Sequence, residues 1–411
     1  MSTGTQNDHI DDPAGTTAEV RGWVGTHHDD LVAFRRHLHT HPELSGQEHD
    51  TTELIAERLT AAGFDPLVLA SGTGVVCDVG APPGADGSAG PAEIALRADI
   101  DGLAMHDDKD VPYRSRNDGV AHACGHDVHT TVILGTGLAL APALARAGRR
   151  ARLIFEPAEE QVPGGAVEVI DEGHLDGIRA VYGLHCDPKL DVGTIGTRRG
   201  PITAAADQVF ITLGGPGGHT ARPQLTVDLV QVAAQLALDL PRLVAERADG
   251  DVLLVFGSLR AGDASNVIPT TAHLAGTLRT PDRAVWATAA SLVADAVETL
   301  LRGTGAEFEV DHRQGVPAVF NHDRETSLLE EAVVAALGPA ARVDTPRSAG
   351  ADSYAWYLER TGGTFARLGT HTPGDPERLD LHRGSFDVDE SAIGIGVRVL
   401  AEAVTRELAL P

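Results

Sequence analysis

Three short apolar segments, each followed at once by polar side chains, constrain the fold of this 411-residue chain most strongly. They are Ile94–Leu96, Leu153–Phe155 and Val181–Leu184, and an apolar helical stretch over about 130–144 separates the first two. Strands that alternate with helices predict an α/β fold with a mostly parallel sheet flanked by helices. Active sites in such sheets gather beyond the carboxyl ends of the strands. We therefore expect a site formed by the residues that follow the three segments, namely Asp99, Asp101, Glu159, Glu160 and His185.

The pattern of elements changes after about Arg198, which indicates a second domain. A chain of this length exceeds one ordinary core, and two domains are expected. The order strand-helix-strand-strand-helix-strand over residues 199–313 resembles a ferredoxin-like α+β unit. We predict a disordered tail at residues 1–18, a first domain formed by 19–198 and 314–411, and an inserted second domain at 199–313.

The stretch His122-Ala123-Cys124-Gly125-His126-Asp127, with His129 just beyond, suggests a metal site. Thiol, imidazole and carboxylate groups are the ligands of divalent transition metals. A lone histidine is more often a capped or exposed residue, but clustering favours metal binding. In a loop, Cys124 and His126 would converge on one point, and a thiolate has enough lone pairs to bridge two ions. His382, far along the chain, is a further candidate ligand.

Adjacent glutamates after the second segment suggest a division of roles. One of Glu159 and Glu160 can bind metal while its neighbour stays free beside a water molecule held between two ions. A free carboxylate in that place is what a general base requires. Each residue also has a plainer interpretation, because Glu-Glu pairs are usually solvated. Asp99 and Asp101 either orient a histidine ligand or cap a helix.

Charge and cysteine content exclude some classes of function. The formal net charge of −26 argues against binding to nucleic acid or to anionic membranes, and we interpret it as favouring solubility. We expect no membrane-spanning segment, because no run approaches about 18 apolar residues. The three cysteines, Cys77, Cys124 and Cys186, are widely spaced, which is typical of a reducing cytoplasm rather than a disulfide framework.

Several motifs in order resemble the M20 amidohydrolase family, and specifically its D branch of aminoacylase-like, hippurate-hydrolase-like and auxin-conjugate-hydrolase-like enzymes. The motifs are RADIDGL (97–103), HACGHD (122–127), PAEE (157–160), GLH (183–185), GGHTARP (217–223), ASNVIP (264–269) and GTLR (276–279). The opening RRHLHTHPELSGQEHDTTELIAERLTAAGF (35–64) is also similar to the start of that family. The likeness extends over about residues 30–400.

The resemblance implies a metal-dependent hydrolase of N-acyl amino acids or related small amides, with a zinc-peptidase-like catalytic domain and an inserted lid that also mediates dimerisation. It implies two divalent ions (Mn, Zn, Co or Ni) in a homodimer or higher homo-oligomer. The implied metal ligands are Cys124 as the bridge, His126, Glu160, His185 and His382. Glu159 would be the general base, and His219 would reach a neighbouring subunit's site and polarise the scissile carbonyl. Asn266 and Arg279 would hold the substrate.

Departures from the family pattern affect the substrate side more than the metal ligands. The final motif is His382-Arg383-Gly384 rather than one ending in Pro, and Asp352 stands where a longer Glu is usual. Two rival functions therefore stay open. One is a metallo-dipeptidase acting on small peptides, and the other is a non-catalytic protein that uses the metal for association.

Overall fold

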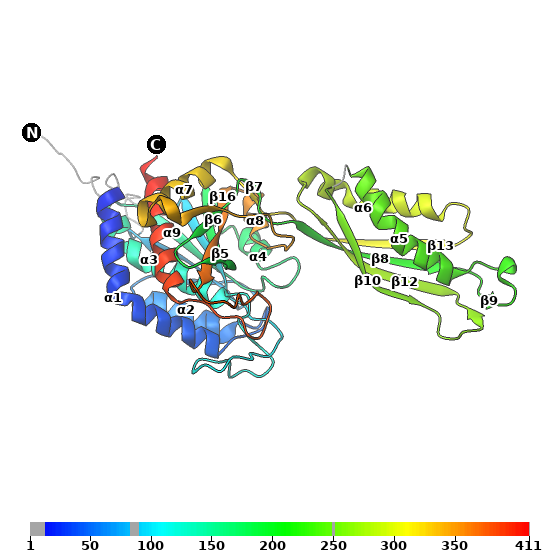
Figure 1. The fold of residues 1–411 in the computed structure, drawn as a ribbon. Coiled ribbons are helices and arrows are strands. Elements are labelled where there is room, and N and C mark those ends of the chain that lie inside the picture. The colour runs from blue at the N-terminus through cyan, green and yellow to red at the C-terminus, as the bar shows by residue number, and fades with distance from the viewer. Residues whose placement is uncertain (1–12, 83–89, 249–250, 411) are drawn as a thin grey trace, which may run out of the picture. The chain divides into compact units, whose positions relative to one another are not determined.

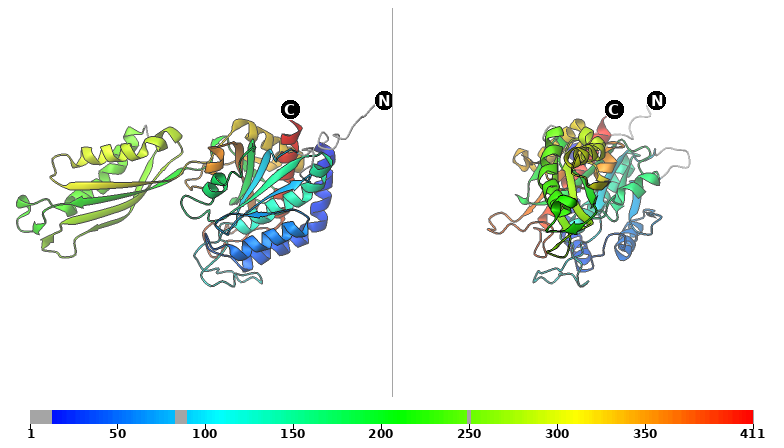
Figure 2. Two further views of the ribbon diagram at one scale, coloured as in Figure 1. Left: turned by 180° about the vertical axis from the view of Figure 1, so that it is seen from behind. Right: turned by 90° about the vertical axis from the view of Figure 1, so that its right-hand side faces the viewer.

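The computed structural model describes residues 13–82, 90–248 and 251–410, which form two compact units (Figures 1 and 2). The first unit combines residues up to Gly200 with Phe320–Pro346 and Trp356–Pro411, and the second combines Pro201–Val319 with Arg347–Ala355. This division differs from the predicted second domain at 199–313, because the second unit extends to Val319 and also includes residues 347–355. The sequence pattern could not show that this short segment leaves the unit that surrounds it in the chain.

An eight-stranded sheet forms the centre of the first unit. Its strands in spatial order are β1 (Leu67–Val68), β2 (Val75–Gly80), β4 (Arg150–Glu156), β3 (Ile94–Asp99), β5 (Ala180–Asp191), β16 (Gly362–His371), β6 (Ile195–Thr197) and β15 (Arg342–Asp344). Strand β3 runs parallel to β4 and β5, and β5 runs parallel to β16, whereas β1 and β2 are antiparallel. The predicted fold class, with its mixed and mostly parallel sheet, is confirmed.

Helices cover this sheet and complete its core. They are α1 (Pro13–Thr40), α2 (His49–Ala61), α3 (His126–Arg146), α4 (Ala166–Asp171), α7 (Asp323–Leu337), α8 (Ala355–Leu358) and α9 (Ser391–Ala409). Helix α3 packs on β2, β3 and β4, and α1 lies against α3 and α9. A Cβ atom at Gly137 would approach the Leu153 side chain to 2.4 Å, so this glycine allows α3 to lie close to the sheet. Short two-stranded pairs and 3₁₀ turns complete the fold: β7 (Gly200–Pro201) with β14 (Phe320–Asn321), β9 (Gly218–His219) with β11 (Val267–Ile268), η1 (Pro223–Leu225) and η2 (Pro339–Ala341).

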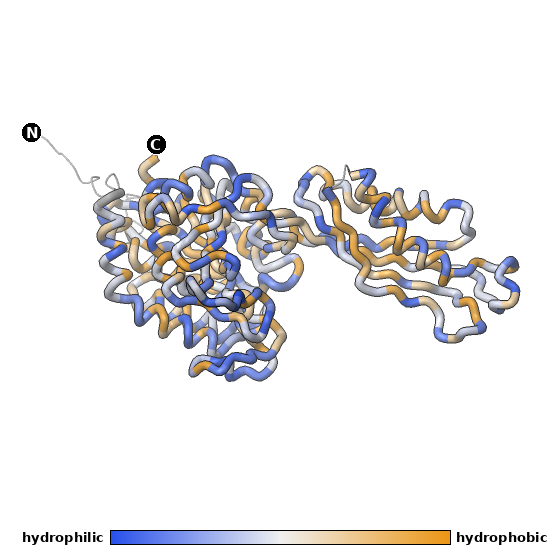
Figure 3. The backbone as a smooth tube through the Cα atoms, viewed as in Figure 1, coloured by the Kyte–Doolittle hydropathy of each residue, from blue (hydrophilic) through white to orange (hydrophobic). Residues whose placement is uncertain are grey.

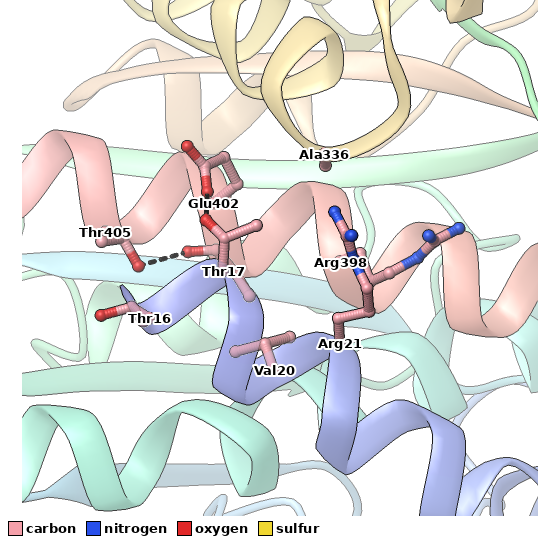
Figure 4. Close-up of a pocket in the computed structure, with 9 residues that line it drawn as sticks. Thr16, Thr17, Val20, Arg21, Ala336, Arg398, Glu402 and Thr405 are labelled. Atoms are coloured by element: carbon pink, nitrogen blue, oxygen red, sulfur yellow. Dashed lines mark hydrogen bonds between the residues drawn. The ribbon is translucent and has the colours of Figure 1, made fainter. Parts of the chain in front are cut away.

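The start of α1 corrects the prediction of a disordered tail at residues 1–18. Residues 1–12 lie outside the described part, but the helix begins at Pro13. Its first turns pack on α9, where the Thr17 hydroxyl donates a hydrogen bond to the Glu402 carboxylate (Figure 4). Further along this contact, the Val20 side chain is 2% exposed. The polar composition of residues 13–18 concealed a helix that is stabilised by packing rather than by its own sequence.

Two helices are more apolar than the sequence analysis expected. By length and composition alone, α3 and α6 (Arg283–Leu301) are long and apolar enough to cross a membrane. In α3, 83% of the apolar window is buried inside the first unit, so its composition is that of a core helix. In α6 the buried share is 28%, and its inward face, which includes Val293 and Val297, belongs to the core of the second unit.

The second unit is a four-stranded antiparallel sheet with two helices. Its strands in spatial order are β10 (Leu253–Ala261), β12 (Thr271–Thr280), β8 (Ala205–Gly214) and β13 (Glu307–Val316). Helices α5 (Leu229–Arg247) and α6 pack on this sheet, and Asp228 and Asp282 accept backbone N–H groups at their first turns. Apolar residues concentrate along the strands and the helix faces that cover them (Figure 3). The chain order β8-α5-β10-β12-α6-β13 matches the predicted ferredoxin-like pattern.

Candidate metal centre

The carboxyl ends of β3 and β4 lie side by side, with Asp99 opposite Glu156 in the register. The motif at residues 122–127 runs into α3, whose first residue is His126, so this histidine lies on a helix rather than in the predicted loop. Gly125 before it has a φ of 89°, and a Cβ atom there would come within 2.8 Å of the Cys186 Sγ atom. Glycine is therefore needed both for the turn and for the close packing beneath the motif.

Five side chains form one group, which we call the thiol–imidazole cluster: Cys124, His126, Glu160, His185 and His382. Ligand atoms of Cys124, His126 and Glu160 all lie within 4.8 Å of one another. The Cys124 Sγ atom is 3.5 Å from His185 Nε2, and His382 Nε2 is 3.3 Å from Glu160 Oε1. The structure thus brings together all five predicted metal ligands, with the thiol near His185 as well as near His126 and Glu160.

Donor spacing in this cluster suits a metal ion. Bonds from zinc to nitrogen, oxygen or sulfur are about 2.0–2.3 Å, so two ligands of one tetrahedral ion lie roughly 3.3–3.8 Å apart. The His126 Nε2 atom is 3.9 Å from Glu160 Oε1 and 4.0 Å from Glu159 Oε2. It is also buried without a hydrogen-bond partner among the described residues. A buried, unpaired imidazole nitrogen facing carboxylates fits a cation site.

Asp101 fixes the orientation of His126. The Asp101 Oδ1 atom lies 3.1 Å from His126 Nδ1, so that nitrogen donates its proton to Asp101 and Nε2 is directed toward the cluster. Asp99 instead holds His129, at 2.6 Å between Oδ1 and Nδ1. Of the two aspartates that the sequence proposed as orienting groups, Asp101 therefore hydrogen-bonds to the candidate ligand, whereas Asp99 hydrogen-bonds to His129 and places its other oxygen 3.7 Å from His126 Nε2.

His129 is occupied on both ring nitrogens. Its Nδ1 faces Asp99, and its Nε2 accepts the backbone N–H of Cys186 at 2.8 Å. Although Asp99, His126 and His129 also lie close enough to one another to hold an ion, the hydrogen bonds of His129 leave it no lone pair for a metal. His129 instead fixes β5 beneath the cluster.

Burial controls the protonation of the cluster. Burial raises the pKa of the Cys124 thiol above its usual range, and burial, followed by the Arg367 guanidinium, holds the pKa of His185 well below its usual range. Burial would lower the pKa of His126, but the Asp99 carboxylate and the Cys124 sulfur raise it well above its usual value. A metal that binds Cys124 must therefore displace a proton from the thiol.

The predicted site residues lie in three kinds of position: in a turn after a strand, inside a strand, and in a distant loop. Glu159 and Glu160 follow β4 in a turn, as expected, with 10% and 17% of their side chains exposed. His185, in contrast, lies inside β5, which continues to Asp191. His382 enters from a loop with a left-handed φ of 59°, and its backbone N–H donates to Ala123 O at 2.8 Å.

A second buried polar group, the Arg35 network, adjoins the motif. It consists of Arg35, His39, Asp107, Lys109 and Asp127. Arg35 Nε donates to Asp127 Oδ2 at 2.6 Å, and His39 Nδ1 lies 2.7 Å from the same oxygen. His39 Nε2 is 3.3 Å from Asp107, which also pairs with Lys109 at 3.0 Å. Here the protein's own cations balance the carboxylates.

The three remaining predicted residues belong to the second unit. His219 is exposed on β9, and its Nδ1 accepts the Ala221 N–H at 3.0 Å, which leaves the proton on Nε2. Asn266 lies before β11 and accepts the Thr220 N–H through its backbone carbonyl. Arg279, on β12, donates to Ala349 O at 2.7 Å.

The residues that hold the Glu159–Glu160 turn are not among those predicted from the sequence. Ser45 and Glu48, in the loop before α2, contact this turn directly. Both residues lie in the stretch Glu43-Leu44-Ser45-Gly46-Gln47-Glu48, which is part of the motif that resembles the start of the family. Nothing in the spacing of this stretch shows that it contacts a turn more than one hundred residues later.

Comparisons with known proteins agree with this geometry. The model of peptidase family M20/M25/M40 matches residues 95–406. The chain is 37% identical over 384 residues to the N-acetyl-L-cysteine deacetylase of Bacillus subtilis, covering 92% of this chain and 88% of that protein. The crystal structure of the Bacillus subtilis YxeP protein, described as a dinuclear metal-binding peptidase of the M20 family, matches with a TM-score of 0.80 and 31% identity over 94% of this chain and 99% of that one.

Another relative is a protein of Rhodococcus jostii named "Putative glutamate--cysteine ligase 2-3". It is 41% identical over 396 residues, or 95% of this chain. The chain spans 48% of that protein, about half of its length.

Proposed function

Because this chain belongs to peptidase family M20/M25/M40, as the resemblance predicted, we propose that it is a metal-dependent amidohydrolase that cleaves N-acyl amino acids or related small amides. Peptidases hydrolyse amide bonds, so the predicted enzyme class is confirmed at the level of the family. One observation carries the proposal further: the buried His126 Nε2 atom has no hydrogen-bond partner among the described residues and faces the carboxylates of Glu159 and Glu160.

In this proposal the thiol–imidazole cluster would hold two divalent ions, with Cys124, His126, Glu160, His185 and His382 as their ligands. The donor set of thiolate, imidazole and carboxylate suits Mn, Zn, Co or Ni. When bound, such ions would polarise the amide carbonyl and lower the pKa of water at the site. The Cys124 Sγ atom lies 3.5 Å from His185 Nε2 and within 4.8 Å of the ligand atoms of His126 and Glu160, which supports Cys124 as a ligand at the centre of the cluster.

Glu159 then acts as the general base. Its carboxylate takes a proton from water in the cluster and returns it to the leaving amine. Asp101 keeps His126 in the tautomer whose Nε2 faces the cluster. The substrate is held by Asn266 and Arg279 of the second unit, and the relative named N-acetyl-L-cysteine deacetylase supports an N-acyl amino acid as the substrate class.

A substrate screen tests this function. The chelated protein is supplied with Mn, Zn, Co or Ni in turn and offered N-acetyl, N-benzoyl and longer N-acyl amino acids, with dipeptides as competitors. We expect hydrolysis of an N-acyl amino acid that depends on added metal. Full activity of the chelated protein would contradict the mechanism, and a clear preference for dipeptides would favour a metallo-dipeptidase.

We further propose that the protein works as a homodimer in the cytoplasm. Strand β10 is an edge strand that exposes Leu253, Val255 and Leu259, an apolar row suited to a second copy. His219 carries its proton on Nε2, so it can donate to a carbonyl oxygen in the partner's site. Mixing His219→Ala protein with Glu159→Gln protein should then restore part of the activity through hybrid dimers. No recovery would place His219 outside a shared site.

A further inference from the structure

We propose that Glu48 is a positioning residue that holds the Glu159–Glu160 turn in its active shape by accepting the backbone N–H of Ala158. The inference rests on the proposed function, because it assigns Glu48 to the placement of the general base. It concerns a residue outside the thiol–imidazole cluster, on the loop that precedes α2.

The turn has a backbone shape that it would not adopt unaided. Ala158 has a φ of 52°, and among the described residues the only other non-glycine residue with a positive φ is His382. A residue with a Cβ atom is disfavoured in the left-handed region and persists there only where its surroundings hold it. Because Ala158 directly precedes Glu159, its conformation sets the direction in which Glu159 leaves the turn.

Glu48 supplies a contact that can hold this shape. The residue is fully buried, and its Oε1 atom accepts the N–H of Ala158 at 2.8 Å and the N–H of Gly46 at 2.9 Å. Its Oε2 atom is buried without a hydrogen-bond partner among the described residues. Burial raises the pKa of Glu48, whereas these backbone N–H groups lower it. A carboxyl group kept inside at this cost has a specific task, and its contacts identify Ala158 as the target.

A second contact fixes the other side of the turn. The Glu160 N–H donates to Asp101 Oδ2 at 3.0 Å, and the Ser45 hydroxyl donates to the same oxygen at 2.6 Å. The Gln161 side chain donates to Ser45 O at 3.0 Å. Glu159 therefore lies between two anchored peptide groups, one at Ala158 and one at Glu160. Asp101 also orients His126, so Glu48 is the anchor that serves the base rather than the metal.

Loss of the Glu48 contact should affect chemistry more than binding. In Glu48→Met, an apolar side chain of similar length fills the space but accepts no hydrogen bond. Ala158 can then relax from the left-handed region and turn the Glu159 carboxylate away. A misplacement of about 1 Å can cost about 100-fold in rate. We expect a kcat loss of that order, with KM and metal content near those of the wild type, since Asp101 still holds Glu160.

Two further variants separate this role from a general structural one. Glu48→Gln keeps an accepting oxygen and should retain most of the kcat. Glu43→Met is the matched control, because the Glu43 carboxylate lies in the same loop but accepts the N–H groups of Asp50 and Thr51 at the start of α2. It should lower stability without a comparable loss of kcat.

The experiment combines steady-state kinetics with hydrogen exchange at the Ala158 amide. We expect Ala158 to be protected in the wild type and in Glu48→Gln, and to exchange rapidly in Glu48→Met. Wild-type kcat and a protected Ala158 amide in folded Glu48→Met would overturn the proposal, as would an equal kcat loss in Glu43→Met. If Glu48→Met does not fold, Glu48→Asp serves instead, because its carboxylate ends one methylene short of Ala158. An unchanged kcat there would also overturn the proposal.

Failure of the proposed function would look different. In that case the metal-loaded wild type would hydrolyse no N-acyl amino acid, whereas the exchange rate at Ala158 would still report whether Glu48 holds the turn.

Discussion

The thiol–imidazole cluster and the Arg35 network lie in the same unit and both combine imidazole with carboxylate groups, yet they differ in the source of positive charge. In the Arg35 network, Arg35 and Lys109 come from the chain itself and lie within 3.0 Å of Asp127 and Asp107. In the thiol–imidazole cluster, the Glu160 carboxylate faces the imidazoles of His382 and His126 at 3.3 and 3.9 Å, with no Arg or Lys among the five members.

This difference explains how adjacent residues of one motif take different roles. His126 faces the thiol–imidazole cluster, whereas Asp127, the next residue, binds Arg35. In both regions the charge of the carboxylates is balanced by a cation, which comes either from the protein or from outside. The first arrangement contributes to folding and the second provides a site for a metal. Substitutions in the two regions should therefore separate loss of activity from loss of stability.

The largest effect is expected for Glu159→Gln, which removes the proposed base and keeps the shape of the side chain. General acid–base groups contribute about 10²–10⁴-fold to rate, so kcat should fall within or beyond that range. Metal content, measured by elemental analysis, should stay near that of the wild type, because Glu159 is not one of the proposed ligands.

Glu160→Gln provides the contrast with Glu159→Gln. This variant should lose metal as well as activity, because Glu160 contacts both His126 and His382. Equal metal loss in the two variants would mean that the roles of the two glutamates are not divided as proposed, and retained activity in Glu159→Gln would place the base elsewhere.

Arg35→Met tests the other region and should act on stability. Arg35 is fully buried and pairs with Asp127, Asp387 and Glu390. Removing one partner of a buried ion pair costs about 3–5 kcal/mol, because the remaining charge is left uncompensated. The free energy of unfolding, measured with urea on the metal-free protein, should fall by about that amount.

The neighbouring Arg36 is the control for Arg35. Its side chain is 46% exposed and binds Glu390 at the surface, so Arg36→Met should cost less than about 1 kcal/mol. If Arg35→Met and Arg36→Met had the same free energy of unfolding, the Arg35 network would not contribute more to stability than a surface ion pair does.

A smaller effect is expected where the protein orients a ligand without touching the metal. Asp101→Asn should weaken metal binding by about 10–100-fold, because partners of ligating histidines typically contribute that much. Asp207→Asn is the matched control, since Asp207 is buried and holds His312 at 2.7 Å in the second unit. Titration with a metal-sensitive dye should detect weaker binding in the first variant only, and equal affinities would remove Asp101 from the site.

Much of the fold could be predicted from the sequence because local patterns carry it. The strand before Asp99 and the strand-helix order of residues 205–316 depend on periodicities that short segments display. Motif spacing likewise predicted that Cys124 and His126, two residues apart, lie close together, and the structure places them in one group.

The features that the sequence did not predict depend on contacts between residues far apart in the chain. The helix at residues 13–18 forms because it packs on α9, and His185 lies inside β5 because β16 continues beside it. The link between Glu48 and Ala158 joins positions 110 residues apart. Such contacts are decided by the complete fold, and no local pattern encodes them.

The smallest effect concerns acid stability in the Arg35 network. Burial alone would raise the pKa of Asp107, but the hydrogen bonds from His39 and from the Ser115 N–H hold it well below its usual value of about 3.9. The folded protein therefore binds this proton more weakly than the unfolded chain. Asp107 contributes stability above the unfolded pKa, and that contribution is lost as the pH falls through the lower, folded pKa.

Asp107→Asn should thus be less stable than the wild type at pH 7, by about 1–3 kcal/mol for a buried charged hydrogen-bonding group. The difference should narrow as the pH falls from about 5 to about 2, because the wild type alone loses stability there. Asp110→Asn, at an exposed carboxylate three residues on, should follow the wild type at every pH. Thermal unfolding across this pH range measures all three proteins. A constant difference between Asp107→Asn and the wild type would mean that Asp107 acts through packing rather than charge, and the balance of charges that distinguishes the Arg35 network would have to come from Asp127 alone.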